Sequence, residues 1–504
     1  MSLAVVYTRA SMGLDAPEVT VEVHIGPGLP SLAIVGLPET AVREARERVR
    51  SALTMAGFEF PPGRITVNLA PADLPKGGGR YDLPIALGIL SASGQLQARL
   101  EGWEFAGELA LGGALRPVPG LLPFALRTRE AGRGLVVPEG SGAEVGVVHP
   151  EALAAGHLLD VCRHLSGEPS LAVARPGPLG AEAAAVADLA DVRGQAGARR
   201  ALEVAAAGGH ALLFSGPPGT GKSMLAARLP GILPPMTHSE ALEAAAVASI
   251  SHHGFRPGQW ARRPFRQPHH SASQAALIGG GRKPGPGEAS LAHRGILFLD
   301  ELPEFPRTAL EALREPLETG EVHISRASAR VSYPARFQLI AAMNPCPCGH
   351  LGDPGGRCRC TPEQVERYRG RLSGPLMDRL DMQADVPRLT AAELQSRSEG
   401  ESSATVRERV AQARDRQQAR AGVENARLQG QALERCCRLT RTDAGLLARA
   451  MDQLGLSARA YHRILRLART IADLEGADGL ATRHITEALS LRRGLEPGRK
   501  APGP

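Results

Sequence analysis

One segment constrains the fold of this chain more than any other. His210–Ser215 is a short apolar stretch, the sequence GPPGTGKS (Gly216–Ser223) follows it directly, and a helix-like stretch continues from Met224. The pattern G-x-x-x-x-G-K-[ST] cradles phosphates when a strand precedes it and a helix follows it. Because both flanking elements are present, a chance glycine-rich turn is a remote alternative. The segment therefore predicts a phosphate-binding loop on a parallel sheet.

Each residue type in this loop has a physical task. Backbone N–H groups surround the phosphates, Lys222 neutralises the β and γ phosphates, and Ser223 is placed to ligate Mg²⁺. We therefore expect ATP and Mg²⁺ as cofactors. The residues predicted to contact the nucleotide are Gly216, Pro217, Pro218, Gly219, Thr220, Gly221, Lys222, Ser223 and Met224.

Two carboxylates complete the predicted site. Gly295–Leu299 (GILFL) is typical of a buried strand, and Asp300 and Glu301 follow it. Ligands of parallel sheets bind at the carboxyl ends of strands. We expect Asp300 to hold Mg²⁺ through water and Glu301 to polarise the water that attacks the γ-phosphate. An acidic turn after a strand is common, but downstream of a phosphate loop it favours nucleotide hydrolysis.

Two later positions are further candidates. Phe337–Met343 predicts another buried strand, and Asn344 at its end can hydrogen-bond the same water or the γ-phosphate. Arg379 lies near Asp378 and Asp381, just before a helical region. An ion pair with one of these two carboxylates is the alternative interpretation of Arg379.

A length of 504 residues allows roughly two to four domains. Strand-like and helix-like stretches alternate in the first unit, where we expect one strand over Glu104–Leu111 and one helix over Pro150–Leu165. The second unit alternates likewise, and the third is almost wholly helical. The predicted division is an α/β domain at 1–167, a Pro- and Gly-rich linker at 168–186, a P-loop α/β domain at 187–389, a helical domain at 390–495 and a tail at 496–504.

The order of these motifs resembles that of AAA+ ATPases, and more narrowly that of the magnesium-chelatase-like YifB/ComM family of competence-related proteins. The resemblance covers nearly the whole chain, and it implies an AAA+ α/β domain followed by a helical lid. The segments that carry it are RQPHHSASQAALIGGG (Arg266–Gly281), GEASLAHRGILFLDELPEF (Gly287–Phe305), MNPCPCGHLGDPGGRCRC (Met343–Cys360), LSGPLMDRLD (Leu372–Asp381) and LSARAYHRILRLARTIADL (Leu456–Leu474).

The resemblance also implies roles for single residues. Asn344 matches the sensor-1 residue, Arg379 the arginine finger offered to the ATP of a neighbouring subunit, and Arg459 the sensor-2 arginine, with Arg463 as the reserve candidate. A finger used between subunits requires a ring, usually a hexamer with ATP at each interface. An added arginine stabilises the charge that spreads in the transition state.

Two insertions match this branch of the family and are expected to point toward the pore of the ring: His269–Lys283 and a hairpin over Gly320–Pro334. Alternation along the hairpin places His323, Ser325 and Arg330 on one side. The cations expected to hold a DNA backbone are Arg326, Arg330 and Lys283, with Arg282 nearby. A solvated hairpin without a ligand is the alternative.

Val67–Pro84 resembles the peptidase domain of Lon-type proteases, which has an S5-like α/β fold. The position of the nucleophilic serine is taken by Asp82, and no serine occurs between Ser51 and Ser91. Because a Ser–Lys dyad needs a hydroxyl near a lysine, we expect no proteolysis. Lys76, Arg80 and Asp82 are candidates for lining a channel, although turn formation explains the neighbouring glycines equally well.

Four of the seven cysteines cluster as Cys346-Pro-Cys348 and Cys358-Arg-Cys360. Four thiol ligands within fifteen residues suggest a tetrahedral, structural Zn²⁺ site, since four thiolates leave no open position. The C-x-C spacing departs from the usual C-x₂-C, so reduced free thiols remain the alternative.

The composition also indicates what kind of partner this protein binds and in which compartment it is found. Lys and Arg number 59 against 52 Asp and Glu, and Ala391–Pro504 holds 20 basic against 14 acidic residues, which permits a polyanion partner. Aromatic residues make up 3%, which argues against base-stacking platforms and favours contact with the nucleic-acid backbone. Without a leader or a long apolar stretch, we expect a cytoplasmic protein that does not enter membranes.

These observations support two functions. The first is a hexameric ATPase that translocates on single-stranded or branched DNA, a helicase that promotes branch migration when DNA is integrated in natural transformation. The alternative is a magnesium-chelatase-like chaperone that remodels a protein partner. The Lon-like domain favours the first, because the resemblance leads us to expect it in the competence branch and not in ordinary chelatase ATPase subunits. An ATP-dependent protease is disfavoured by the missing serine.

Overall fold

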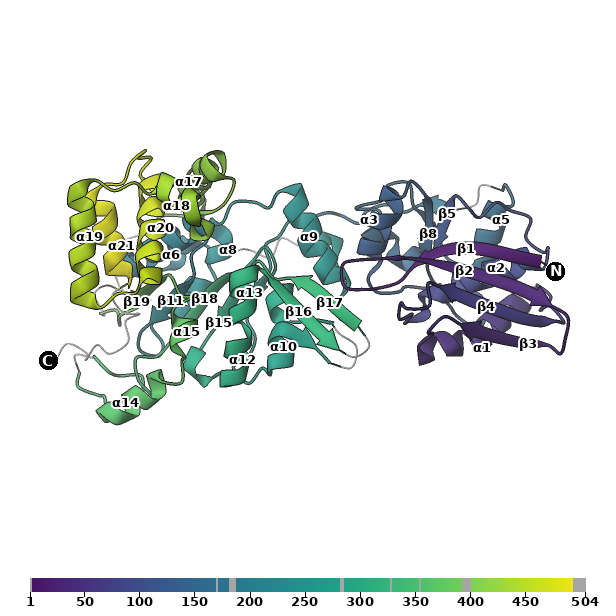
Figure 1. Cartoon of the computed structure of the whole chain (residues 1–504), viewed down its shortest axis with the longest axis horizontal. Coiled ribbons are helices and arrows are strands. Elements are labelled where there is room, and N and C mark those ends of the chain that lie inside the picture. The colour runs from purple at the N-terminus through teal and green to yellow at the C-terminus, as the bar shows by residue number, and fades with distance from the viewer. Residues whose placement is uncertain are drawn as a thin grey trace.

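Two sheets organise the chain (Figure 1), as seen in the computed structural model. The structure describes residues 2–168, 171–180, 187–281, 285–326, 329–352, 355–390, 393 and 400–492. An eight-stranded sheet belongs to the N-terminal unit, and a five-stranded sheet belongs to the unit that carries the phosphate loop. Helices that follow the second sheet in sequence pack against it.

The N-terminal sheet alternates buried and partly exposed side chains along its central strands. Helices α1 (Thr40–Met55) and α2 (Asp82–Ala92) cover its buried face, and α1 contributes Val42, Ala45, Val49 and Ala52, which recur every three to four residues. The strands, in sheet order, are β10 (Ala172–Val173), β9 (Leu153–Ala155), β8 (Gly134–Pro138), β5 (Trp103–Phe105), β1 (Ser2–Arg9), β2 (Glu18–Gly26), β4 (Arg64–Ala70) and β3 (Ser31–Val35).

Two expectations for this unit are wrong in part. The single strand expected over Glu104–Leu111 is broken, because the chain leaves β5 after Phe105 and pairs again as β6 (Glu108–Leu109) with β7 (Leu115–Arg116). The helix expected over Pro150–Leu165 covers only α5 (Leu158–Leu165), because Leu153–Ala155 adds a parallel strand to β8. In both cases sheet pairing overrides the local pattern.

A buried ion-pair network holds this sheet together. Glu104 is fully buried and accepts hydrogen bonds from Arg9 Nε and Arg9 NH2, each at 2.7 Å. Thr128 Oγ1 donates to the same carboxylate at 2.6 Å, and Arg133 NH1 donates at 3.1 Å. The network thus joins β1, β5 and α3 (Leu121–Glu130) through one buried carboxylate.

Replacing Glu104 by Ala should strand the buried guanidinium of Arg9 without its charge partner. We expect the free energy of unfolding of this unit to fall by about 3 to 5 kcal/mol, as is typical for breaking a buried pair from one side. Urea denaturation followed by Trp103 fluorescence would measure it, since Trp103 lies next to Glu104 in β5. The matched control is Glu101→Ala at an exposed turn, and equal midpoints for both variants would contradict the expectation.

The three charged residues expected to line a channel are buried instead. The expectation of a charged channel lining is therefore wrong. Lys76 donates to the carbonyl of Pro71, and Arg80 NH2 donates to the carbonyl of Pro119 at 2.7 Å. Asp82 is fully buried and pairs with Arg48 at 2.7 Å. These side chains hold the loop before α2 in place, because buried charges are retained only when they are paired or hydrogen-bonded.

The second sheet is entirely parallel. Nearly all residues of its three central strands are buried, as expected for a sheet covered on both faces. Its strands, in sheet order, are β12 (Phe265–Arg266), β15 (Ile296–Leu299), β18 (Gln338–Met343), β11 (Leu212–Ser215) and β19 (Met382–Asp385). The other helices of this unit are α6 (Ala196–Gly208), α7 (Lys222–Ala226), α8 (Leu229–Ile232), α9 (His238–Ser249), α10 (Gln274–Ile278), α11 (Glu288–Leu291), α12 (Arg307–Ala312), α13 (Arg314–Thr319), α14 (Pro362–Arg369) and α15 (Gly374–Met377).

The C-terminal helices share one hydrophobic core with this sheet. Ile464, Leu467 and Ile485 lie in the same cluster as Leu212 and Phe298 of the central strands. The helices are α17 (Ser403–Ala421), α18 (Gly430–Cys436), α19 (Arg441–Leu454), α20 (Ala458–Leu474) and α21 (Thr482–Arg492). The predicted helical character of this region is confirmed among the described residues.

The N-terminal unit contacts the second unit through α3 and α9. Ser249 at the end of α9 accepts hydrogen bonds from the backbone N–H groups of Gly120 and Leu122. The β1–β2 connection also reaches β17 (Ala329–Pro334), since a Cβ built on Gly13 would lie 2.7 Å from Val331 Cγ1. No helix in the described part of the chain has the length and apolar character needed to cross a bilayer.

Candidate functional site

The predicted nucleotide site forms at the carboxyl ends of three neighbouring strands. The register aligns Ser215 of β11 with Met343 of β18, so the phosphate loop and Asn344 leave the sheet at one level. Asp300 follows β15, the next strand along. A cavity of about 380 Å³ lies there, lined by Pro218, Gly219, Thr220, Gly221, Lys222, Ser223, Met224, Asp300, Glu301, Met343 and Asn344. Of the residues predicted in the loop, Gly216 and Pro217 lie outside this lining.

The glycines of the loop are required by its path. Gly219 and Gly221 have φ angles of +74° and +93°, where side chains other than glycine are strained. A Cβ on Gly216 would lie 2.2 Å from the carbonyl oxygen of Val386, so the loop can pass the end of β19 only without a side chain. The loop is therefore held open for backbone N–H groups to face a ligand.

The Lys222 amine lies inside the loop. Its Nζ donates to the carbonyls of Gly216 and Pro217, each at 2.8 Å, and to Asn344 Oδ1 at 3.1 Å. Burial lowers the pKa of Lys222, and the carboxylates of Asp300 and Glu301 oppose that shift. The residues predicted as the phosphate lysine and the sensor-1 asparagine are thus in direct contact.

The two predicted Mg²⁺ residues also meet. Ser223 Oγ donates to Asp300 Oδ2 at 2.5 Å. Mg²⁺ prefers hard oxygen ligands and keeps several waters, and a hydroxyl beside a carboxylate at a phosphate loop supplies that donor set. The residues present therefore fit a nucleotide-bound Mg²⁺, which would supply neutralising charge on the phosphates.

Glu301 has a neighbour that the sequence interpretation did not assign. Its backbone adopts φ +53°, uncommon for a residue other than glycine, and its side chain is half-exposed. His270 Nδ1 lies 3.2 Å from Glu301 Oε2. The two residues meet because β12 lies beside β15 in the parallel sheet, so the segment after β12 emerges near Glu301.

The structure places Arg379 away from the cavity of its own chain. Its guanidinium donates to the carbonyls of Pro375 at 2.6 Å and Arg314 at 3.3 Å, and it pairs with Glu318. The ion pair anticipated with Asp378 or Asp381 is thus replaced by one with Glu318. An arginine finger that serves a neighbouring subunit need not reach the site of its own chain, and the role stays a prediction.

The two sensor-2 candidates differ in their surroundings. Arg463 forms an ion pair with Asp381 and donates to the carbonyl of Arg379 at 3.2 Å. Burial alone would raise the pKa of Asp381, but Arg463 and His210 outweigh it and hold that pKa well below its usual range. The side chain of Arg459 is 69% exposed and lies 4.0 Å from Asp378. Arg459 is therefore the candidate that can move toward a ligand at little cost.

Gln195 is a second residue that the sequence interpretation missed. It begins α6 with φ +54°, and its Nε2 donates to the carbonyls of Pro387 at 2.7 Å and Thr220 at 3.4 Å. It thus joins the phosphate loop to the end of β19. Its buried Oε1 has no hydrogen-bond partner among the described residues, which leaves an acceptor beside the loop.

The predicted hairpin insertion is present as β16 (Glu321–Arg326) and β17. Ser325 pairs with Arg330 in the antiparallel register, so these two positions share a face, as the alternation predicts. The other insertion contains α10 and the short pair β13 (Gly279–Gly280) and β14 (Gly285–Pro286). Arg282, Lys283 and the side chains of Arg326 and Arg330 lie outside the described residues.

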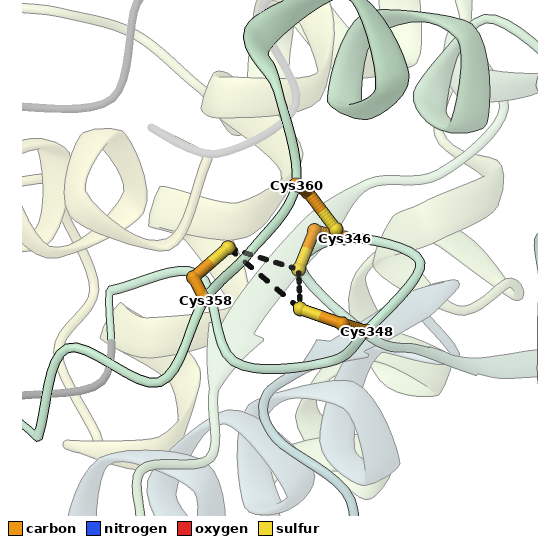
Figure 2. Close-up of side chains that lie close together, drawn as sticks. All are labelled: Cys346, Cys348, Cys358 and Cys360. Carbon is orange, nitrogen blue, oxygen red and sulfur yellow. Dashed lines mark hydrogen bonds between the residues drawn. The ribbon is translucent and has the colours of Figure 1, made fainter.

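The four clustered cysteines also come together. The sulfur atoms of Cys346, Cys348, Cys358 and Cys360 all lie within 4.8 Å of one another (Figure 2). The loop that carries them connects β18 to α14, directly after Asn344.

Both units are similar to known proteins. Family models described as magnesium chelatase, subunit ChlI; subunit ChlI of Mg-chelatase; and magnesium chelatase, subunit ChlI C-terminal match residues 188–394, 21–141 and 400–492. An uncharacterized protein YifB from Salmonella typhimurium is 55% identical over 98% of this chain and 97% of its own length. The competence protein ComM of Haemophilus influenzae is 52% identical over 98% of each chain. The chain belongs to the YifB/ComM family.

Membership of the YifB/ComM family confirms the resemblance derived from the motifs. A magnesium-chelatase 38 kDa subunit from Cereibacter sphaeroides is 25% identical over 44% of this chain and 62% of its own length. The parallel sheet with its helical C-terminal region fits a magnesium-chelatase-like AAA+ fold. The YifB/ComM relatives match along their whole length, whereas the chelatase subunit matches over a part.

Proposed function

We propose that this protein hydrolyses ATP and uses the energy to translocate on DNA as a hexameric ring. The observation that carries the ATPase is the meeting of Lys222, Asn344, Ser223 and Asp300 at one sheet edge beside Glu301. The arrangement has a lysine for the phosphates, oxygen ligands for Mg²⁺ and a carboxylate base for water. Ring formation is proposed from the match of Arg379 to an arginine finger, which acts on the ATP of a neighbouring subunit.

The DNA substrate is supported by different evidence. The Haemophilus relative is named a competence protein and is 52% identical over 98% of this chain. The segment after β12 follows one strand of the sheet that carries the nucleotide site, and the hairpin β16–β17 precedes another, β18. Both insertions contain cations in sequence. We propose that the ring promotes branch migration on single-stranded or branched DNA during natural transformation, with Lon-like N-terminal domains that do not cleave peptides.

A second candidate, remodelling of a protein partner, is favoured by the family models, which take their descriptions from a magnesium chelatase subunit. The two functions share the ATP site, so only the stimulating partner separates them. The DNA motor is favoured by the extent of the match, since the competence protein ComM covers 98% of this chain and the chelatase subunit covers 44% of it.

The deciding test measures the ATPase rate with forked, branched and single-stranded DNA over a salt series. We expect DNA to raise the ATPase rate and added salt to cancel that increase. For single strands, the slope of log affinity against log salt concentration should be about −0.7 for each phosphate contact. Lys222→Ala protein is the control for contaminating ATPases. A rate that no DNA changes at any salt concentration contradicts the motor and favours the protein remodeller.

Substitution of the hairpin cations tests whether this part of the chain binds the DNA. Replacing Arg326 or Arg330 by Ala should lower the salt slope of DNA binding by about one each if they contact phosphates. Arg43→Ala, an exposed arginine on α1, is the matched control. Unchanged slopes in the hairpin variants would place the DNA elsewhere, and strand displacement assays with the same variants would show whether translocation follows binding.

A further inference from the structure

The loop between β18 and α14 brings four thiols together next to the nucleotide site. The Sγ atoms of Cys346 and Cys348 are 3.4 Å apart, and Cys358 Sγ lies 3.8 Å from the first and 3.7 Å from the second. Cys360 turns its sulfur toward Cys346 (Figure 2). Zn–S bonds of about 2.3 Å in a tetrahedron place the sulfur atoms about 3.8 Å apart, which these separations approach.

The same separations exclude a disulfide in this conformation, since a disulfide needs sulfur atoms about 2.05 Å apart. Every cysteine of the chain is a free thiol. Backbone N–H groups of Arg359 and His350 donate hydrogen bonds to the sulfur of Cys348. Donors of this kind stabilise a thiolate, the form that binds metal ions.

The cysteine loop also contacts the phosphate loop of the nucleotide site. Gly349, next to Cys348, adopts φ +80° and contacts the phosphate loop so closely that a Cβ there would lie 2.6 Å from Pro218 Cδ. On the other side, Asn344 precedes Cys346 by two residues and accepts a hydrogen bond from Lys222 Nζ at 3.1 Å. Two contacts therefore join the cysteine cluster to the loop predicted to hold phosphates.

The described part of this loop has no regular secondary structure. Residues 345–361 contain no helix or strand among those described, and the turn from Cys346 to Gly349 is closed by one backbone hydrogen bond of 2.9 Å. Arg369 of α14 donates to the carbonyl of Pro345 at 3.3 Å. Three of the four thiols are partly exposed, so hydrophobic burial contributes little here. An ion bound by all four sulfur atoms would replace a missing core, as in small zinc-bound units.

We propose that Cys346, Cys348, Cys358 and Cys360 bind one structural Zn²⁺, and that this ion holds Asn344 and Pro218 in the positions that nucleotide binding requires. The four thiolates close the coordination sphere, so the ion takes no part in the chemistry. The metal site is independent of the proposed function, whereas its effect on nucleotide binding rests on the proposed ATP site. Because binding free energies are reciprocal, nucleotide and zinc must raise each other's affinity by the same factor.

The first experiment measures metal on the intact, full-length protein. We expect about one zinc ion per chain by elemental analysis, and on replacement with Co²⁺ the intense visible bands and thiolate charge-transfer absorption of a tetrahedral sulfur site. Cys358→Ser and Cys360→Ser should lose the metal, while Cys162→Ala, a thiol in the N-terminal core, should keep it. Zinc-free protein with four titratable thiols, or a cobalt spectrum without thiolate bands, overturns the proposal.

The second experiment tests the coupling without hydrolysis. Chelator-treated protein and Cys358→Ser protein should bind a fluorescent ATP analogue about tenfold more weakly, a typical coupling between linked sites, and the analogue should raise zinc affinity by the same factor. Re-addition of zinc should restore binding to the chelated protein and not to the variant. Zinc that binds without changing nucleotide affinity overturns the positioning role, and nucleotide that never binds to zinc-loaded protein refutes the ATP site instead.

Discussion

Glu301→Gln is expected to abolish ATP turnover while leaving ATP binding and ring assembly intact. The amide keeps the size of the side chain at a backbone position with φ +53°, but it cannot accept the proton of the attacking water. General-base contributions are typically about a hundred- to ten-thousandfold, and we expect a loss of kcat in that range with little change in the affinity for ATP. Steady-state phosphate release and binding of a fluorescent ATP analogue would separate the two quantities.

Glu366→Gln, an exposed position on α14, is the matched control for this variant. Hydrolysis that continues undiminished in Glu301→Gln would reject Glu301 as the base. His270→Ala adds information, since His270 Nδ1 lies 3.2 Å from Glu301 Oε2 and can orient the carboxylate toward the attacking water. A change in kcat without a change in ATP affinity is the expected result.

Arg379→Ala is expected to reduce hydrolysis by about a thousandfold or more, the range known for arginine fingers. The reason is electrostatic, because the guanidinium would stabilise charge on the γ-phosphate of the neighbouring subunit in the transition state. Within its own chain Arg379 pairs with Glu318 and two backbone carbonyls, so a structural role is the competing explanation. Activity alone cannot distinguish them.

Mixing two inactive proteins does distinguish them. In a mixed ring, an Arg379→Ala subunit brings an intact Lys222, and a Lys222→Ala neighbour brings an intact Arg379, so their shared interface should hydrolyse ATP. We expect partial recovery of phosphate release on mixing, and an unchanged melting temperature for each variant alone. No recovery in rings shown to contain both proteins would count against a finger that acts between subunits.

Local sequence patterns predicted the nucleotide site because each of its parts follows a buried strand. Asn344, Asp300 and the loop before Lys222 come after β18, β15 and β11, and a parallel sheet brings those ends together without further information. The contact between His270 and Glu301 was missed because β12 is only two residues long and the sequence gives no clear strand pattern there. Gln195 was missed because its role depends on where β19 ends, which no local sequence pattern indicates.

In the N-terminal unit, by contrast, local sequence patterns gave wrong predictions. Motif matching placed Lys76, Arg80 and Asp82 in a loop and suggested that their charges face a channel. The structure buries all three. Arg48 and Pro119, the partners of Asp82 and Arg80, come from parts of the chain 34 and 39 residues away, whereas Lys76 donates to the nearby carbonyl of Pro71. The break after Phe105 and the strand at Leu153–Ala155 were likewise decided by pairing with other strands, which no local pattern reports.

The shared core of the second unit bears on how the protein is made. Helix α6 and strand β11 leave the ribosome long before α20 and α21, yet Ile464 and Ile485 of those helices fill the same core as Leu212. Arg492, in the last described turn, donates to the carbonyls of Leu380 and Asp381 beside β19. Until those helices emerge, the apolar surfaces of α6 and β19 that they cover stay exposed. The nascent chain should therefore need protection from aggregation until α20 and α21 have emerged, and it should acquire nucleotide affinity only after that point.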